Sequence, residues 1–257
     1  RYPFVRHNGN LKQVIEPIIL GIAAPNGSNP AQITDEESTV FELDDTNLLS
    51  LDRFAGHDKV DSGSRIVYGV RFGMYGETIG DITGFLGQSY RFHTDRDLRS
   101  SRLLEEDFSD YVGRIDIKPN QYVDLLYRAR FSESDLSARS SAIGFSVGPS
   151  AMKVSGNYFF VEEGTAAGNS DQREELRLTL GSKINRFWSA ALGTHRDLTD
   201  NGGSLEHTLR ALYQDECFGF EATAQRTFTR GTDIEPESRI LFRFIFKHLG
   251  QVQSSAG

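Results

Sequence analysis

Cysteine is almost absent from this chain of 257 residues, because Cys217 is the only one. A single cysteine excludes a framework of internal disulfides, although it leaves room for a bond to a partner. Long hydrophobic runs are absent as well. The longest, near Ile18 to Ala24, is far shorter than the roughly 20 residues that a membrane-spanning helix needs. The net charge of −8 argues against a nucleic-acid partner, whose phosphates would repel the chain.

Signatures of catalysis and of metal binding are missing too. The six histidines are scattered, none of them occurs in an H-E-x-x-H spacing, and there is no G-x-S-x-G. We therefore expect no enzyme activity, no cofactor and no metal site. A Ser–His pair on the outer face of a barrel stays open as an alternative, because catalytic groups can assemble from distant parts of a sequence.

What the chain has instead is an alternation of polar and apolar residues. From Arg239 it reads R-I-L-F-R-F-I-F-K-H, a period of two that is typical of a β-strand. Most of these stretches have 10 to 13 residues, close to the 9–11 or so that a tilted strand needs to cross a membrane. The thirteen stretches are 1–7, 11–21, 64–76, 79–92, 107–118, 121–132, 136–147, 150–162, 173–184, 187–197, 204–214, 217–228 and 239–248.

The connections between these stretches alternate between short and long. The longer ones are 22–63, 93–106, 133–135, 163–172, 198–203 and 229–238, although 133–135 is about as short as the tight turns. In outer-membrane barrels the short turns face the periplasm and the long loops face outside. We therefore predict an all-β fold, an antiparallel transmembrane β-barrel, with the C-terminus on the periplasmic side.

Aromatic residues fall at both ends of the predicted strands, where a barrel carries its interfacial girdles. The outer set is Phe92, Phe108, Tyr111, Phe131, Phe160 and Phe228, and the periplasmic set is Tyr122, Phe145, Trp188, Tyr213, Phe218 and Phe246. The two faces of the strands also differ. In the stretch 64–76, Ile66, Tyr68 and Val70 fall on one face of the strand, and Arg65 and Arg71 fall on the other. Charged residues are not accepted in a packed core without partners, which favours a wet lumen, although a soluble sandwich with outward charges would alternate in the same way.

Several motifs occur in order along the chain. They are Glu16-Pro17, the acidic Asp35-Glu36-Glu37-Ser38, Asn47-Leu48, the stretch R-F-A-G-H-D-K from Arg53 to Lys59, and Gly63 before Tyr68-Gly69. Taken together, these motifs resemble the C-terminal barrel region of the LptD family, which assembles lipopolysaccharide in Gram-negative outer membranes. The tail from Phe244 to Gly250 is similar to the closing strand of that family. We expect the resemblance to cover residues 1–257, as the second half of a larger LptD-type barrel.

The resemblance implies transport of lipopolysaccharide and its insertion into the outer leaflet through the barrel lumen and a lateral gate. It also implies an LptE-like lipoprotein plug, and an LptA-like periplasmic bridge reached through an upstream jelly-roll domain. The chain starts with Arg1 and shows no signal peptide, so we expect it to be part of a longer precursor. Residues upstream or a partner chain would complete the wall, because an open sheet edge cannot sit in lipid.

The resemblance also implies roles for particular residues. Cys217 would form a disulfide with the upstream periplasmic domain, the alternative being an inert thiol. The lateral-gate strand would comprise Arg239, Ile240, Leu241, Phe242, Arg243, Phe244, Ile245, Phe246 and Lys247, the alternative being an ordinary strand that closes the barrel. The acidic loop 22–63 would be extracellular or folded into the lumen, and its carboxylates match no calcium-loop spacing.

Arginines on the polar face are candidates for contacts with lipopolysaccharide phosphates, because a guanidinium grips phosphate bidentately. The alternative is that they pair with neighbouring acids on the same face. The candidates are Arg65, Arg71, Arg128, Arg130 and Arg177, and Arg114 and Arg243 lie on the same face.

Two other functions remain open from the sequence. The runner-up is a self-contained outer-membrane porin or channel of about 12–14 strands, which would conduct ions by itself. The third is a soluble, many-stranded carbohydrate-binding protein, which would stay in solution without detergent.

Overall fold

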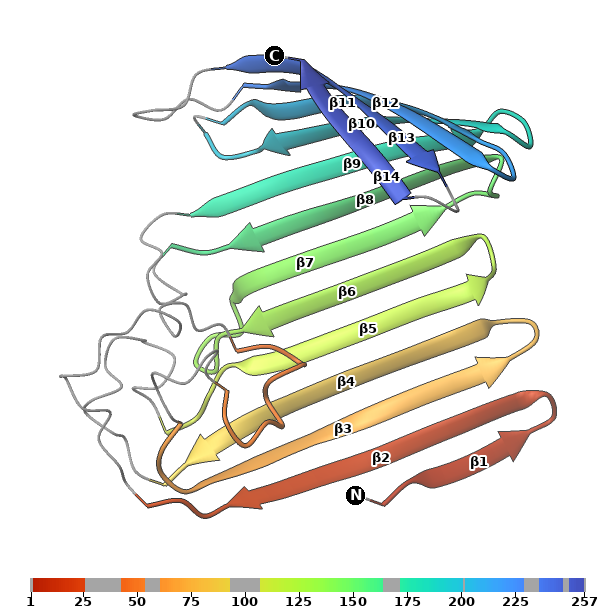
Figure 1. The fold of residues 1–257 in the computed structure, drawn as a ribbon. Coiled ribbons are helices and arrows are strands. Elements are labelled where there is room, and N and C mark those ends of the chain that lie inside the picture. The colour runs from red at the N-terminus through yellow and green to blue at the C-terminus, as the bar shows by residue number, and fades with distance from the viewer. Residues whose placement is uncertain are drawn as a thin grey trace. The chain divides into compact units, whose positions relative to one another are not determined.

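The computed structural model shows a chain built from antiparallel strands (Figure 1). It describes residues 2–25, 43–53, 61–92, 107–163, 172–200, 202–228, 236–246 and 250–256. Fourteen strands occur in these ranges, and each is hydrogen-bonded to its neighbours in chain order, from β1 to β14. The all-β, antiparallel prediction is confirmed, and this meander is the topology of an up-and-down barrel wall. No helix in the described ranges is long and apolar enough to cross a membrane.

The strand bounds are close to those expected from the alternating pattern. They are β1 Phe4–Asn8, β2 Leu11–Ile22, β3 Arg65–Gly76, β4 Gly80–Arg91, β5 Tyr111–Asn120, β6 Val123–Phe131, β7 Ala138–Val147, β8 Met152–Val161, β9 Arg173–Lys183, β10 Trp188–Asp197, β11 Ser204–Gln214, β12 Phe218–Thr227, β13 Glu237–Phe246 and β14 Gly250–Ala256.

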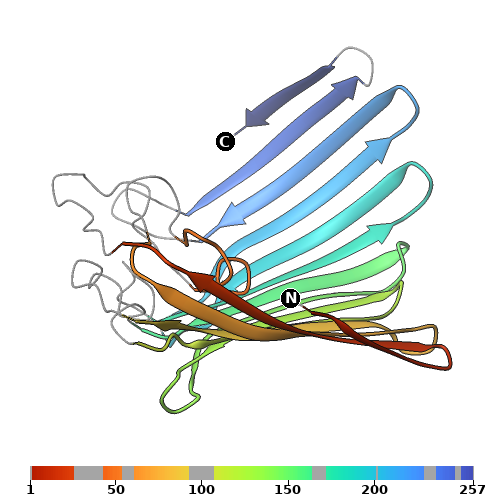
Figure 2. The same ribbon diagram turned by 90° about the horizontal axis from the view of Figure 1, so that it is seen from below.

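The chain divides into two compact units, and the division passes through β7 and β8. One unit comprises residues 1–143 and 159–173, and the other comprises 144–158 and 174–257. In the first unit, β1 to β6 pair as consecutive hairpins. In the second, β9 to β14 do the same, and Figure 2 shows β10 to β13 side by side.

Glycine shapes the tight turn between β3 and β4. Gly80 has a φ of +67°, a conformation that side chains with a Cβ rarely adopt. A Cβ at this position would also lie 2.1 Å from the carbonyl oxygen of Lys118 on β5. The turn therefore requires glycine both for its backbone angle and for the close approach of the next strand.

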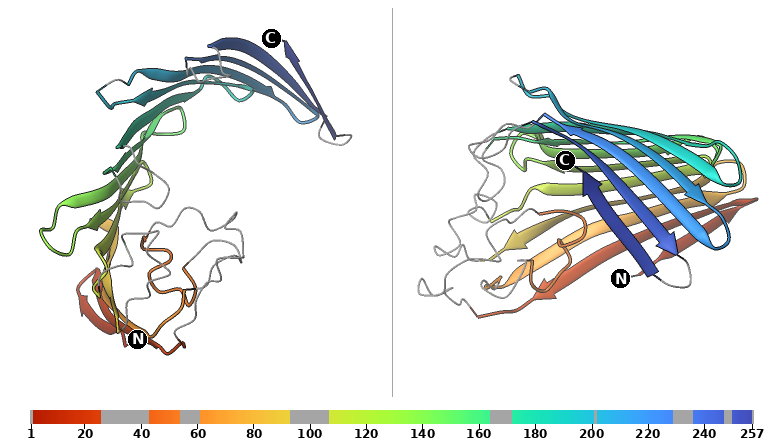
Figure 3. Two further views of the ribbon diagram at one scale, coloured as in Figure 1. Left: turned by 90° about the vertical axis from the view of Figure 1, so that its left-hand side faces the viewer. Right: turned by 45° about the horizontal axis from the view of Figure 1, so that its top comes forward.

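The only apolar core cluster in the described residues lies on one face of β2 to β5 in the first unit. Leu43 and Leu48, from the segment between β2 and β3, pack there against Ile18, Val67 and Phe85, with Val112 beside them. Figure 3 (left) shows this segment, in orange, against one side of those strands. The part 43–53 of the long connection therefore contributes side chains to the core.

The fourteenth strand is the main difference from the sequence expectation. The stretch 239–248 was expected to be the last strand, but β14 follows it and pairs with β13 from Ile240↔Ala256 to Phe246↔Gly250. The pattern missed β14 because Gln251 to Ser255 contain a single strongly apolar residue, Val252, and so no alternation. Residues 107–110 also lie outside β5, although Phe108 forms an isolated bridge with Tyr90.

Candidate functional site

One face of the sheet is apolar and exposed in the second unit. The register places Leu180, Leu192, Leu209, Ala224 and Ile240 directly opposite one another across β9 to β13, so all five project from the same face. Leu192 and Leu209 are 54% and 51% exposed. A continuous apolar surface of this kind is rare on soluble proteins and indicates contact with lipid or with another apolar surface.

The first unit has an equivalent apolar face. Ile19 lies opposite Tyr68, and Ile115 lies opposite Tyr127, and all four side chains are exposed. The buried Val67 and Ile18 project from the other face, beneath the segment 43–53. The structure therefore has the predicted division of β3 into two faces. Ile66, Tyr68 and Val70 lie on one face, and Arg65 and Arg71 lie on the other.

Aromatic rings gather on the apolar face near the short turns of the second unit. Trp188 lies 5.2 Å from Tyr213, and Phe218 lies 5.7 Å from Phe246, measured between ring centroids. Phe220 belongs to the same group of rings and contacts Phe244, with 5.1 Å between the ring centroids. At the long-loop end of the first unit, Tyr90 contacts Phe92 and Phe108 at 5.4 and 4.8 Å. Each unit thus carries rings at an end of its strands, where a membrane barrel carries an interfacial belt.

The opposite face carries charges that pair with one another. In the first unit, Asp45 of the segment 43–53 lies 3.2 Å from both Arg114 and Arg128, on β5 and β6. Arg114 also donates to Asp116 at 2.6 Å. Arg130 is buried, and its Nε lies 3.4 Å from Asp110. The two ion pairs of Asp45 attach the segment to the polar side of the strands.

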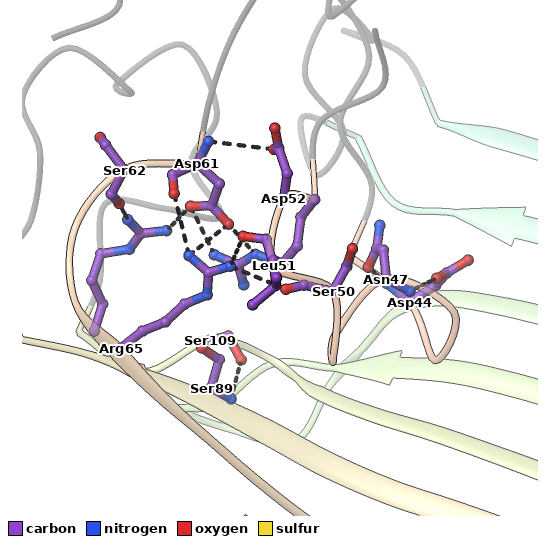
Figure 4. A network of polar contacts seen from close by, with 12 residues as sticks. Asp44, Asn47, Ser50, Leu51, Asp52, Asp61, Ser62, Arg65, Ser89 and Ser109 are labelled. Atoms are coloured by element: carbon purple, nitrogen blue, oxygen red, sulfur yellow. Dashed lines mark hydrogen bonds and ion pairs between the residues drawn. The ribbon is translucent and has the colours of Figure 1, made fainter. Parts of the chain in front are cut away.

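A second cluster, centred on Asp61, fixes the end of the same segment (Figure 4). Its carboxylate lies 2.5 Å from Arg53 Nε, 3.1 Å from Arg65 Nη1 and 2.6 Å from Arg91 Nη2. All four side chains are buried, and that of Arg65 is fully so. Arg65 also donates from Nη2 to the carbonyl oxygens of Ser50 and Leu51, at 3.1 and 2.7 Å. One carboxylate thus joins the segment, β3 and β4.

The surroundings of Asp61 stabilise the ionised form of its carboxyl group. Burial by itself would raise the pKa of its carboxyl, but the hydrogen bond and positive charge of Arg53, with the charge of Arg65 and a hydrogen bond from Arg91, outweigh it. The pKa is therefore lowered from its ordinary value of 3.8. Asp61 is the acid that makes it possible to bury three arginines together, because an unpaired buried charge is strongly unfavourable.

The segment 43–53 is shaped locally by its own polar side chains. Asp44 Oδ1 accepts hydrogen bonds from the backbone N–H groups of Thr46 and Asn47, and Asn47 Oδ1 accepts one from the N–H of Asp44. Leu48 N–H then donates to the carbonyl oxygen of Asp44 at 3.0 Å, which closes a single turn. This Asx-type turn presents Leu43 and Leu48 to the strands below.

The structure divides the predicted phosphate-binding arginines into two groups. Arg65, Arg128 and Arg130 lie against acids of this chain, as the alternative reading of the sequence allowed. Arg71 lies over the ring of Phe85 at 5.7 Å and lines a recess of about 490 Å³ with Arg114. Arg177 lies 3.4 Å from His195 on the polar face. Contact of any of them with lipopolysaccharide stays a prediction.

The predicted gate strand corresponds to β13, apart from Lys247, which lies outside the described residues. Ile240, Phe242, Phe244 and Phe246 are between 38% and 48% exposed, and the residues between them project to the opposite face. On that face Arg243 lies 3.9 Å from Glu221. The role of β13 in a lateral gate stays a prediction.

Cys217 is exposed in the short turn between β11 and β12, and its thiol is free. The turn is held by Asp215, whose Oδ1 accepts the N–H groups of Cys217 and Phe218 at 2.9 and 2.7 Å. The structure thus places the thiol at the short-turn end, where it is accessible to a partner. The proposed disulfide itself stays a prediction.

The Asp61 cluster was missed as a unit in the sequence, although a signal for it was present. The short turn after Gly76 sets the β3–β4 register, and this register brings Arg65 opposite Arg91. Like charges directly opposite one another in a sheet destabilise it and need a counter-ion. Asp61, four residues before Arg65, is the nearest acid in the sequence. Within the described ranges, no three His, Cys, Asp or Glu residues gather to hold a metal ion.

A comparison with protein families identifies the family of this chain. A comparison with curated proteins gives no match. Residues 1–188 match the protein family described as LptD: LPS transport system D. The match covers most of the chain, from β1 to β9 and the first residue of β10. The chain belongs to the LptD family, and it takes part in lipopolysaccharide transport.

Proposed function

We propose that this chain is the C-terminal part, residues 1–257, of an LptD-type barrel in the outer membrane of a Gram-negative bacterium. There it would insert lipopolysaccharide into the outer leaflet. The observation that carries the proposal is the opposition of two faces on the same strands. One face is exposed and apolar along the row of side chains that runs across the strands from Leu180 on β9 to Ile240 on β13. The other face carries paired charges such as Arg210 with Glu221.

The two faces suit the two chemistries of the substrate. The sugars of lipopolysaccharide require a wet passage, and its acyl chains require an apolar medium. A wall that is polar inside and apolar outside separates these media. A seam that opens lets each part of the substrate travel in the medium that it prefers.

The finer roles belong to the same proposal. The β13 strand, Arg239 to Phe246 with Lys247, would form one side of the lateral gate, together with β14, which follows it. The connection 22–63 would lie in the lumen, held by Asp45 and Asp61. Cys217 would bond to an upstream periplasmic domain that leads to an LptA-like bridge, and an LptE-like lipoprotein would occupy the barrel.

Depletion and complementation of the full-length protein test this function. Cells that lose the protein should stop delivering new lipopolysaccharide to the cell surface, as measured by antibody labelling of intact cells after a metabolic pulse. An intact copy should restore delivery. Normal surface delivery after complete depletion would contradict the proposal.

A bilayer measurement separates this proposal from the porin alternative. The purified native complex should contain a larger chain and a plug protein, and it should show little steady ion conductance. If this chain alone is recovered from membranes and forms stable ion channels in a planar bilayer, the porin is the better account.

A further inference from the structure

The apolar face of β10 to β13 contains a groove near the long-loop end of these strands. It has a volume of about 770 Å³, and its floor is formed by Leu192, Leu209, Ala224 and Ile240. Volumes of roughly 300–1,000 Å³ are typical of sites for small ligands. The floor is mainly apolar and belongs to the face that we assign to lipid.

A basic rim lies at one end of this groove. His207 and Arg226 stand opposite each other on β11 and β12, two residues closer to the long loops than Leu209 and Ala224. Two residues of strand correspond to about 7 Å. Both rim side chains are exposed. The groove thus has an apolar floor and a cationic edge at the level of the proposed outer leaflet.

The Arg226 guanidinium is oriented by an aromatic ring, and it has no carboxylate partner among the described residues. It lies over the ring of Phe228, with its central carbon 5.1 Å from the ring centroid. Phe228 also contacts His207 at 5.1 Å between ring centroids. Stacking of this kind uses the face of the guanidinium and leaves its in-plane N–H donors available.

The acids at the same height project from the other face. Glu206 and Glu237 both stand opposite Thr227, one residue beyond Arg226, and so lie on the polar face of the strands. Glu206 accepts a hydrogen bond there from Thr208. Within the described part of these strands, the rim therefore has an uncompensated positive charge, which complements an anionic headgroup.

We propose that this groove binds the lipid portion of a lipopolysaccharide molecule from outside the barrel. Its acyl chains would lie along Leu209 and Ile240, and a phosphate would be bound by Arg226 with His207. The inference rests on the proposed function for its orientation in the membrane. It adds a site on the lipid-facing wall, outside the passage, that would hold lipopolysaccharide in the outer leaflet beside β13.

Photocrosslinking in living cells tests the occupant of the groove. A photoreactive amino acid at Leu209 of the full-length protein should capture lipopolysaccharide. The same photoreactive amino acid at Leu86 is the control, and it should capture much less lipopolysaccharide. Leu86 is an exposed apolar position of β4, and the residue two positions along the strand is Gln88 rather than an arginine. Equal capture at both positions, or capture at Leu209 of phospholipid alone, would overturn the proposal.

A binding measurement on the purified native complex tests the phosphate contact. Arg226→Gln should weaken binding of lipid A in detergent by about tenfold, the effect of losing a hydrogen bond to a charged group. Dephosphorylated lipid A should bind with the same affinity to the wild type and the variant. Arg186→Gln, which changes an arginine stacked on the ring of Phe187 at 4.4 Å in the short turn between β9 and β10, is the matched control and should leave binding unchanged. Equal loss in both variants, or no loss in Arg226→Gln, would refute the site.

The two proposals fail separately. If Leu209 captures no lipopolysaccharide while depletion still stops surface delivery, the groove is wrong and the transport function stands. If the groove binds lipid A in an Arg226-dependent way but surface delivery does not depend on the protein, the transport function is wrong.

Discussion

Replacing Asp61 with Asn tests how the segment between β2 and β3 is held on the polar face. The substitution keeps the size of the side chain and removes its charge. The carboxylate contacts Arg53, Arg65 and Arg91 at 2.5 to 3.1 Å, and all of these groups are buried. The variant leaves three guanidiniums buried together without the acid that neutralises them in part.

The expected cost follows from the burial. Removing one partner of a buried ion pair costs roughly 3–5 kcal/mol, because the other charge stays buried and uncompensated. Asn can still accept a hydrogen bond, so we expect the lower end, about 3 kcal/mol. The apolar contacts of Leu43 and Leu48 remain. The free energy of opening the segment should therefore fall while the strands stay folded.

Hydrogen exchange of residues 43–53, in the full-length protein in detergent, measures this opening. A fall of about 3 kcal/mol corresponds to an increase in exchange of roughly 100-fold, since about 1.4 kcal/mol is a factor of ten. Asp124→Asn is the matched control, because Asp124 pairs with Lys118 at 3.2 Å and half of its side chain is exposed. Such pairs contribute about 0–1 kcal/mol. Equal exchange in the two variants would refute the reasoning.

The same contact has a predicted pH dependence. The pKa of Asp61 is lowered from 3.8 on folding, so its stabilisation is fully present above that value and is lost as the pH falls through the folded pKa. Exchange of residues 43–53, corrected for its intrinsic pH dependence, should not change between about pH 7 and pH 5. The segment should loosen only below pH 3.8. Loosening near neutral pH would show that another group controls it.

Four further variants test separate parts of the structure. Leu48→Ala, at a fully buried position, should destabilise the segment by about 2–5 kcal/mol, measured as the same exchange in residues 43–53. Leu209→Arg, on the exposed apolar face, should cost up to about 2–4 kcal/mol in membrane folding assays, whereas Leu212→Arg on the polar face should cost much less. Gly80→Ala should lower folding yield, because a Cβ would meet the Lys118 carbonyl at 2.1 Å, and Gly21→Ala, which has open space, should not. Cys217→Ser should abolish the mobility shift of the full-length protein on non-reducing gels, and an unchanged shift would remove the disulfide proposal.

The strands and their faces could be predicted from sequence because the constraint on them is local. A residue such as Phe242 must be apolar if its face meets lipid, and its neighbour Arg243 need not be, so a period of two appears in the sequence. The pattern located thirteen strands within a few residues of their observed bounds. It failed at β14, where Gln251 to Ser255 pair with β13 through the backbone, which leaves no mark on the side-chain pattern.

The ion-pair clusters could not be predicted in the same way, because they join parts of the chain that are distant in sequence. Asp45 meets Arg114 and Arg128 across more than sixty positions, and the sequence shows only that acids and arginines are both abundant. The arginines were recognised as residues of the polar face. Their partners depend on how the connection 22–63 folds back, which no period or spacing specifies.

The most direct test of the two-faced wall is the accessibility of alternate residues along β13. Single cysteines at Ile240, Phe242 and Phe244, and at Leu241, Arg243 and Ile245, would be introduced one at a time into a full-length variant in native membranes, in which Cys217 and every other cysteine are replaced by serine. A water-soluble, membrane-impermeant maleimide should label the second set and spare the first, and a lipid-soluble quencher should reach a fluorophore attached to the first set alone. Labelling of Ile240, Phe242 and Phe244 from water, with Leu241, Arg243 and Ile245 protected, would contradict the account.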